Sequence, residues 1–158
     1  MHPSRFLPVA ASRTASLTAG LLFATLAGAT SPSPAGLWRT IDDTTGKPRG
    51  EIRIVVADGA AQGQIVRSLV AGEDPDKRCD KCPGERKGQR IVGMIILTAL
   101  KPDPNDPLRW DGGELLDPDS GSVYRARLQI APDGKTMDVR GFVGISLFGR
   151  SQVWQRAE

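Results

Sequence analysis

The sequence predicts an all-β domain: an eight-stranded antiparallel up-and-down barrel, with a β-sandwich as the alternative. Short apolar runs recur at regular spacing between turn-forming residues. After the N-terminal segment, no stretch has the period of a long helix. An eight-stranded meander also leaves two unpaired edges unless it closes on itself. A closed barrel of this size is filled by its own side chains or holds one small ligand.

The first 29 residues have the features of a cleaved signal peptide. Arg5 and Arg13 give a positive start, an apolar run follows, and Ala27-Gly28-Ala29 matches the small-x-small cleavage pattern. The run is shorter than the ~20 apolar residues of a membrane-spanning helix. We therefore expect export to the periplasm, or secretion. Removal of the two leader arginines leaves 19 of the 21 basic residues against 18 acidic ones, so no basic surface for nucleic acid is expected.

The single domain, residues 36–158, is expected to begin with three strands joined by tight turns. A lead-in rich in proline and serine, residues 30–35, precedes it and is expected to be flexible. The first strand is "GLWRTI" (36–41). The next, 51–57, alternates apolar and charged residues, and Asp58-Gly59 turns the chain into a third strand over 61–70.

A long loop and a buried strand follow. Residues 71–89 are rich in charge, proline and glycine, which predicts a loop without buried structure. Residues 90–100, "RIVGMIILTAL", are apolar on both parities. A short buried helix is compatible with this run, but Gly93 and the β-branched residues favour a central strand.

The C-terminal part is expected to supply four more strands. "KPDPNDP" (101–107) interrupts the chain with three prolines, and a strand follows over 108–116. Residues 122–130 alternate cleanly between apolar and polar side chains. The last two strands are expected over 136–148 and 150–156.

The long loop holds the pair Cys79 and Cys82, which we expect to form a disulfide. A close cysteine pair in an oxidising compartment is commonly a disulfide, although reduced thiols or a metal role remain alternatives. Zinc would need two further ligands. The single histidine, His2, leaves with the signal peptide, so the mature chain has none. This excludes Ser-His-Asp and Cys-His catalysis and imidazole metal sites. We expect no metal and no cofactor.

The last strand places polar and aromatic residues on one face. Arg150, Gln152, Trp154 and Arg156 have the same parity. If Trp154 points into the barrel, the arginines point in with it, and charged groups are costly to bury unless they are paired. Such a cavity would accept an anionic head group. If Trp154 faces outward instead, the arginines are solvated. The expected ligand-binding residues are Trp38, Trp110, Tyr124, Arg150, Gln152, Trp154 and Arg156.

The stretch "RGFVGISLFGR" (140–150) is expected to turn the chain at the barrel's closing corner or at a binding mouth. Glycine inside a strand usually marks a bulge, a bend or a close approach. If Val139, Gly141 and Val143 share the core face, Phe142 faces outward until the glycines bend the chain. The expected turn or mouth residues are Gly141, Phe142, Gly144, Phe148 and Gly149.

The carboxylates of "WDGGELLDP" do not predict an enzyme. Paired carboxylates can perform acid–base chemistry. However, Asp111 and Glu114 have opposite parity, which directs them to opposite faces of a strand. Asp117 stands in a turn, where aspartate normally bonds to nearby backbone.

Several segments together resemble a bacterial family, domain of unknown function 2147 (DUF2147). They are "GLWRT", "TGKPRG", the cysteine pair, "IVGMIIL", "GGELLDPDSGSVYRARL" and "MDVRGFVGISLFGRSQVWQR". The resemblance implies an exported lipocalin-like barrel. The G-x-W at Trp38 and the late Arg156 also resemble the lipocalin pair that packs together to close one end of the barrel.

These expectations favour a non-catalytic binding protein. We expect the barrel to hold a small apolar or amphipathic molecule, either lipid-like or anionic. The alternative is an envelope protein–protein interaction module with a filled barrel and no ligand. Side chains that fill the interior would favour the second hypothesis, and a cavity would favour the first.

Overall fold

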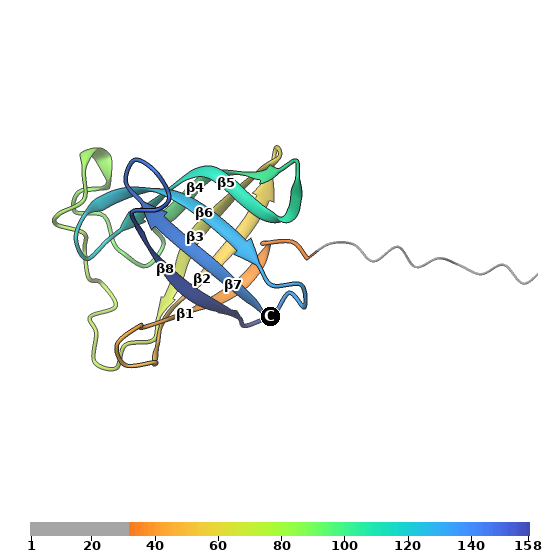
Figure 1. Cartoon of the computed structure of the whole chain (residues 1–158). Coiled ribbons are helices and arrows are strands. Elements are labelled where there is room, and N and C mark those ends of the chain that lie inside the picture. The colour runs from red at the N-terminus through yellow and green to blue at the C-terminus, as the bar shows by residue number, and fades with distance from the viewer. Residues whose placement is uncertain (1–31) are drawn as a thin grey trace, which may run out of the picture.

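The computed structural model describes residues 32–158, which form a closed barrel of eight antiparallel strands (Figure 1). Each strand pairs with its neighbours in sequence, and β8 closes the barrel on β1. The prediction of an up-and-down barrel is confirmed, and the sandwich alternative is wrong. The expected signal peptide lies outside the described residues. The strands are β1 (Gly36–Ile41), β2 (Pro48–Ala57), β3 (Ala60–Ser68), β4 (Ile95–Asp103), β5 (Asp106–Asp117), β6 (Ser122–Ile130), β7 (Thr136–Phe142) and β8 (Gly149–Arg156).

The β4–β5 region differs most from the expected boundaries. β4 begins at Ile95 instead of residue 90, and "KPDPNDP" forms a hairpin instead of an interruption. Pairing between β3 and β4 reaches only to Leu100. Pro102 therefore lies where β4 has one neighbour, and a missing N–H is tolerated there.

Glycine positions introduce irregularities into the barrel. β5 has a bulge between Trp110 and Gly113, and Gly112 within it has a φ of 78°. A side chain on Gly113 would collide with the backbone of β4 at Thr98. These glycines therefore let β4 and β5 approach each other closely and change which face later β5 side chains occupy.

One end of the barrel is closed by Trp38 and Arg156. The guanidinium of Arg156 lies 4.2 Å from the centre of the Trp38 ring. Arg156 also donates hydrogen bonds to the carbonyl oxygens of Ser33, Ala35 and Gly134. The expected pairing of Trp38 with Arg156 at a closed end is confirmed. The same bonds fix the lead-in from Ser33 onward against the barrel, so this part is packed where a flexible segment was expected.

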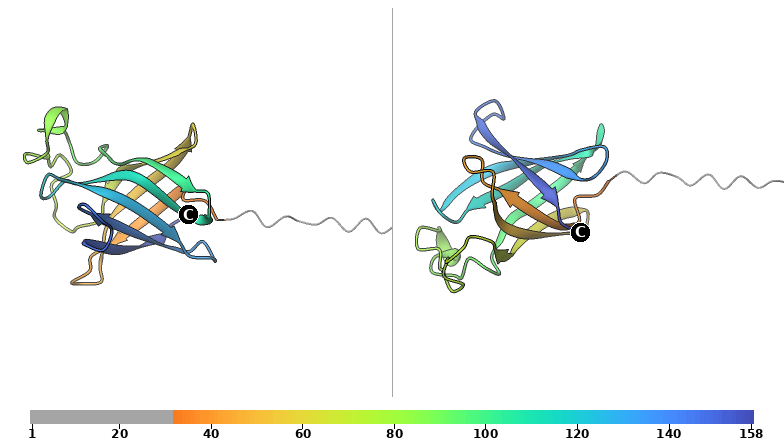
Figure 2. Two further views of the ribbon diagram at one scale, coloured as in Figure 1. Left: turned by 45° about the horizontal axis from the view of Figure 1, so that its top comes forward. Right: turned by 90° about the horizontal axis from the view of Figure 1, so that it is seen from below.

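The other end of the barrel carries the longer connections (Figures 1 and 2). The β3–β4 connection, residues 69–94, contains the short helix η1 (Gly84–Arg86). Cys79 and Cys82 form the predicted disulfide. Both cysteines are buried, at 1% and 2% exposure, although no buried structure was expected in this loop. The connection, called the disulfide loop below, packs on the β5–β6 turn, where the backbone of Lys81 lies against Gly121.

Candidate ligand-binding site

A cavity of about 490 Å³ lies inside the barrel and opens at the end that carries the disulfide loop. This volume lies within the roughly 300–1,000 Å³ of pockets that hold small molecules. Strands from all around the barrel supply its apolar walls. The apolar and aromatic side chains that line it within the strands are those of Ile41, Ile52, Ile65, Ile96, Leu115, Leu116, Tyr124, Val139, Phe142 and Trp154.

Gln152 and Tyr124 each place a polar group among these walls. Trp154 is buried at 2% exposure and donates a hydrogen bond from Nε1 to Gln152 Oε1 at 3.4 Å. Both residues come from β8, and β6 contributes Tyr124 across the cavity. Among the described residues, neither the Gln152 amide nitrogen nor the Tyr124 hydroxyl has a protein hydrogen-bond partner. Both groups can therefore orient a polar part of a ligand.

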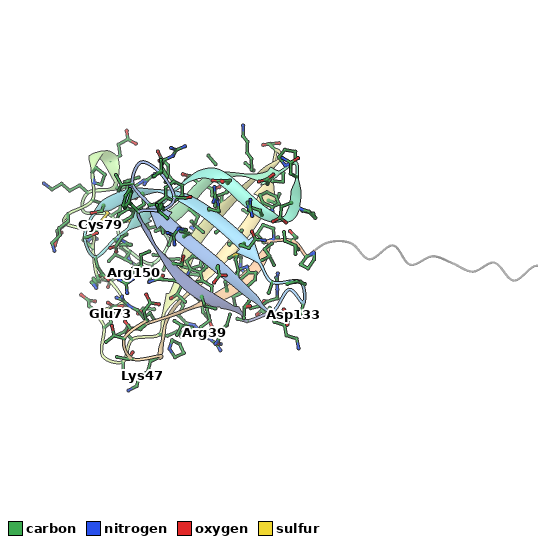
Figure 3. The ribbon with its side chains drawn as sticks, in the orientation of Figure 1. Arg39, Lys47, Glu73, Cys79, Asp133 and Arg150 are labelled. Atoms are coloured by element: carbon green, nitrogen blue, oxygen red, sulfur yellow. A yellow bond between two sulfur atoms is a disulfide. The ribbon has the colours of Figure 1, made fainter. Side chains whose placement is uncertain are left out.

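Ion pairs connect the segments around the mouth. Asp119 on the β5–β6 turn accepts hydrogen bonds from Arg49 at 2.7 Å and Lys77 at 3.1 Å. Lys77 also pairs with Glu73 at 2.7 Å. In Figure 3, Cys79, Glu73 and Arg150 lie at this end, whereas Asp133 lies at the opposite one. Asp119 therefore connects β2 and the disulfide loop to the β5–β6 turn at the cavity mouth.

The pKa directions agree with these contacts. Burial would raise the pKa of the Asp119 carboxyl, but the hydrogen bonds from Lys77 and Arg49 hold it below its ordinary value. Hydrogen bonds from Lys77 and Ser68 lower the pKa of Glu73. The pKa of Lys77 is raised by the hydrogen bonds that it donates to Glu73 and Asp119. All three groups are therefore charged at neutral pH.

The mouth carries more acidic than basic side chains. Six carboxylates line it against four cations, and one of these cations, Arg67, pairs with Glu51 on the outer face. The excess negative charge disfavours an anion at the mouth. The lining charges are Asp42, Asp43, Glu73, Asp74, Asp117 and Asp119, with Arg49, Arg67, Lys77 and Arg150.

The structure separates the expected ligand-binding residues into two groups. Tyr124, Arg150, Gln152 and Trp154 line the cavity. Trp38, Arg156 and Trp110 do not, because the first two close the opposite end and Trp110 pairs with Pro102 beside the β4–β5 hairpin. Trp154 faces inward, and Arg150 and Gln152 share its side of β8, as the parity predicted. Arg150 is paired with Asp43 at 2.6 Å, so its charge is already compensated.

The β7–β8 connection forms one side of the mouth. Phe142 lies on the outer face of β7 opposite Arg125, as expected, and is covered there at 5% exposure. Val143, which was expected on the core face, is instead 68% exposed. The reason is that β7 ends at Phe142, so strand alternation does not extend to Val143. Gly144 has a φ of 69° and turns the chain. Of the expected mouth residues, those that line the cavity are Gly141, Phe142, Phe148 and Gly149.

Two carboxylates of β5, Asp111 and Glu114, occupy the outer face of the barrel. The bulge at Gly112 shifts the register, so that Asp111 bonds to Arg127 at 2.7 Å and Glu114 lies opposite Arg125. The expectation that Asp111 and Glu114 point to opposite faces is therefore wrong, because it assumed a regular strand. Asp117 bonds to the backbone of Asp119 and the hydroxyl of Ser120, as expected for a turn aspartate.

Sequence reasoning missed most of the cavity and all of its rim pairs. Alternation in residues 51–57 and 61–70 could have identified Ile52 and Ile65 as inward-facing. No local pattern could have brought Asp119 to Arg49, which is 70 residues away. Within residues 32–158, no group of three or more His, Cys, Asp or Glu side chains is placed to hold a metal. No helix in the same range is long and apolar enough to span a membrane.

Residues 36–156 match a family model described as "Uncharacterized protein conserved in bacteria (DUF2147)". The chain belongs to the DUF2147 family. The match covers every strand of the barrel, from the start of β1 to the end of β8, and includes the disulfide loop. The resemblance noted in the sequence is thereby confirmed.

The barrel of this DUF2147 protein is similar to a solved structure from Helicobacter pylori. That structure is described as "Protein HP1028 from the human pathogen Helicobacter pylori belongs to the lipocalin family". The two chains share 15% sequence identity with a TM-score of 0.67, over 78% of this chain and 82% of the other. At this identity the similarity shows a common lipocalin-like fold. No curated protein matches the sequence significantly.

Proposed function

We propose that this DUF2147 protein is an exported binding protein that holds one small apolar or amphipathic molecule in its barrel and performs no catalysis. The observation that carries the proposal is the cavity of about 490 Å³, which has apolar walls and a charged rim. An amphipathic molecule fits this arrangement because its apolar part gains free energy by leaving water while its polar part stays at the mouth.

The charges at the mouth favour a neutral or cationic polar group. The carboxylates that line it outnumber the cations, and Arg150 is engaged by Asp43. The arginines of β8 suggested an anionic head group at the sequence level. Such a group would be repelled by the excess of carboxylates at the mouth. Deeper in the cavity, Tyr124 and Gln152 offer hydrogen bonds to an uncharged polar group such as a carbonyl or an amide.

The absence of catalysis is supported by the positions of the carboxylates. Asp111 and Glu114 lie on the outer face, away from the cavity. At the rim, Glu73 and Asp119 are bound to lysine or arginine, and their lowered pKa values make them poor proton donors at neutral pH. Export is supported by the signal-peptide features of the sequence and by the disulfide.

The cavity also argues against the alternative of a filled barrel. A barrel that served only as a scaffold could fill this space with side chains, which would add buried apolar contacts.

Native mass spectrometry of the protein purified from its exporting host tests the proposal. We expect a mass above that of the polypeptide, released on denaturation and identifiable as a single small apolar or amphipathic molecule. A mass that matches the disulfide-bonded polypeptide alone, together with no binding from a lipid extract of the host, would overturn the proposal.

A matched pair of variants locates the binding site. Val139 lies in the cavity wall, whereas Val153 on β8 is 48% exposed. Val139→Phe narrows the cavity, so we expect ligand recovery to fall at least tenfold. Crowding a fitted apolar site costs about 1–3 kcal/mol, and each 1.4 kcal/mol of binding free energy is about a tenfold change in affinity. Val153→Phe makes the same change outside the cavity and should leave recovery unchanged. Equal recovery from both variants would place the ligand elsewhere.

A further inference from the structure

The β7–β8 connection exposes an unusual set of apolar side chains. Val143, Ile145, Leu147 and Phe148 are 68%, 62%, 75% and 70% exposed, and each is more exposed than any other large apolar side chain in residues 32–158. We call these four side chains the apolar tip. Figure 2 shows the connection extending beyond the strands that it joins.

The exposure of the apolar tip is imposed by a braced loop. Arg140 donates hydrogen bonds to the carbonyl oxygens of Ser146 and Leu147, at 2.7 and 3.3 Å. Arg125 donates to the carbonyl oxygen of Gly144 at 3.2 Å. These bonds hold the backbone while the four side chains remain exposed. Keeping apolar groups in water in a fixed conformation is unfavourable and usually marks an interaction surface.

The charges beside the apolar tip indicate its partner. Arg125 and Arg140 donate to neutral oxygen atoms, and Arg125 also lies 5.7 Å from the centre of the Phe142 ring. Within residues 32–158, neither arginine forms an ion pair with a carboxylate. The register places Glu114 opposite Arg125, and Asp138 is two residues before Arg140, but neither forms an ion pair with them. Two uncompensated cations at the base of an apolar loop complement an anionic lipid surface.

The size of the apolar tip favours a lipid surface over a protein. A stable protein interface buries roughly 800 Å² on each partner, spread over some 20–30 residues. Four side chains at a loop tip fall well short of that. Insertion to the depth of the lipid head groups, in contrast, needs only a few apolar side chains with cations beside them.

We propose that the apolar tip inserts into membranes that contain anionic lipid, where Arg125 and Arg140 on the outer faces of β6 and β7 meet the head groups while the acidic rim of the mouth stays in water. Val143 and Phe148 belong both to the tip and to the cavity lining, so the docked loop lies at the cavity entrance. Docking needs only the outer surface of the loop. The proposed membrane docking is therefore independent of whether the cavity holds a ligand.

Co-sedimentation with lipid vesicles tests this inference on the protein purified from its host. The vesicles are phosphatidylcholine alone and phosphatidylcholine mixed with phosphatidylglycerol. We expect wild type to bind the mixed vesicles more tightly, with an affinity that falls as salt rises. Leu147→Ser with Phe148→Ser should weaken binding at least tenfold, because two large apolar contacts are lost. Ile145→Ser, which does not line the cavity, should weaken it in the same direction.

A matched control removes two exposed apolar side chains elsewhere. Val55 and Val153 are 49% and 48% exposed on β2 and β8. Val55→Ser with Val153→Ser should bind vesicles like wild type. All variants carry the same N-terminus, so differences in vesicle binding come from the substituted side chains. Near-ultraviolet circular dichroism checks that each variant is folded.

The inference is overturned if wild type does not bind vesicles or if the tip variants bind as well as wild type. It is also overturned if sedimentation without lipid shows a dimer that the tip variants lose.

Discussion

At the scale of single residues, Glu51 is the buried charge that the fold compensates most completely. Its side chain lies on the outer face of β2 between Arg67 at 2.6 Å and Arg39 at 3.3 Å, and the residue is only 3% exposed. Burial by itself would raise the pKa of Glu51, but the hydrogen bonds from Arg67 and Arg39 hold it below the ordinary value of 4.5. The three residues join β1, β2 and β3 on one face.

The stability that Glu51 contributes should depend on pH in a defined direction. Because its folded-state pKa is lowered, the contribution is present above pH 4.5 and is lost as the pH falls through the folded-state value. We expect Glu51→Gln to lower the free energy of unfolding by about 1–3 kcal/mol at pH 7, and by much less at pH 3. Urea unfolding at both pH values measures the difference. Glu85→Gln, on exposed η1, should show no such pH dependence, and a pH-independent loss for Glu51→Gln would contradict the assignment.

At the scale of structural elements, the disulfide loop depends on the β5–β6 turn. Lys77 pairs with Asp119 in that turn, and the backbone of Lys81 packs directly on Gly121. Gly121 has a φ of 74°, a conformation that favours glycine. The turn therefore needs glycine both for its own backbone and for the loop that lies on it.

Two glycines with the same φ angle separate these effects. Gly59 in the β2–β3 turn also has a φ of 74°, but a side chain there would meet nothing within 4 Å. Both Gly59→Ala and Gly121→Ala should lose roughly 1 kcal/mol to backbone strain. Only Gly121→Ala should also release the disulfide loop, seen as faster amide hydrogen exchange over residues 69–94. Equal exchange in the two variants would show that the loop does not rely on this contact.

The same elements show how far the sequence predicts this fold. Alternation, turn residues and, for residues 90–100, a run rich in β-branched residues located all eight strands, because these signals are local. The prediction that Asp111 and Glu114 lie on opposite faces was wrong because of the bulge at Gly112. A bulge changes the face of the sheet on which later residues lie, but it leaves no mark in the alternation of apolar and polar residues. The rim was not predictable, since Asp119 meets Arg49 and Lys77 only after β2, the disulfide loop and the β5–β6 turn come together. The net charge at the mouth depends on which side chains the folded segments bring together there. The class of ligand that this charge favours was therefore not predictable either.

At the scale of the whole molecule, the two ends of the barrel differ in structure. One end is closed by Trp38 and Arg156 and contains the bonds to Ser33, Ala35 and Gly134. The other end holds the cavity mouth, the ion pairs and the apolar tip. We therefore expect mutations at the closed end to affect stability and mutations at the open end to affect binding.

Arg156→Lys tests whether a change at the closed end affects stability without affecting ligand binding. Lysine cannot reproduce the guanidinium that stacks on Trp38 and donates to three carbonyl oxygens. We expect the free energy of unfolding to fall by about 2 kcal/mol, while the affinity for the cavity ligand stays within about twofold of wild type. Urea unfolding and ligand titration measure the two quantities, and Arg53→Lys, on exposed β2, serves as the control. A tenfold loss of affinity in Arg156→Lys would contradict the separation of the two ends.

The position of the C-terminus has a practical consequence for experiments on surfaces. Ala157 bonds to Leu37 beside the closed end, so the last residues emerge on the side opposite the cavity mouth (Figure 1). A peptide tag added after Glu158 would therefore attach the barrel to a sensor chip in one orientation. Every immobilised molecule would then present its opening to the flowing solution, and screening of metabolite libraries could proceed without the support blocking entry.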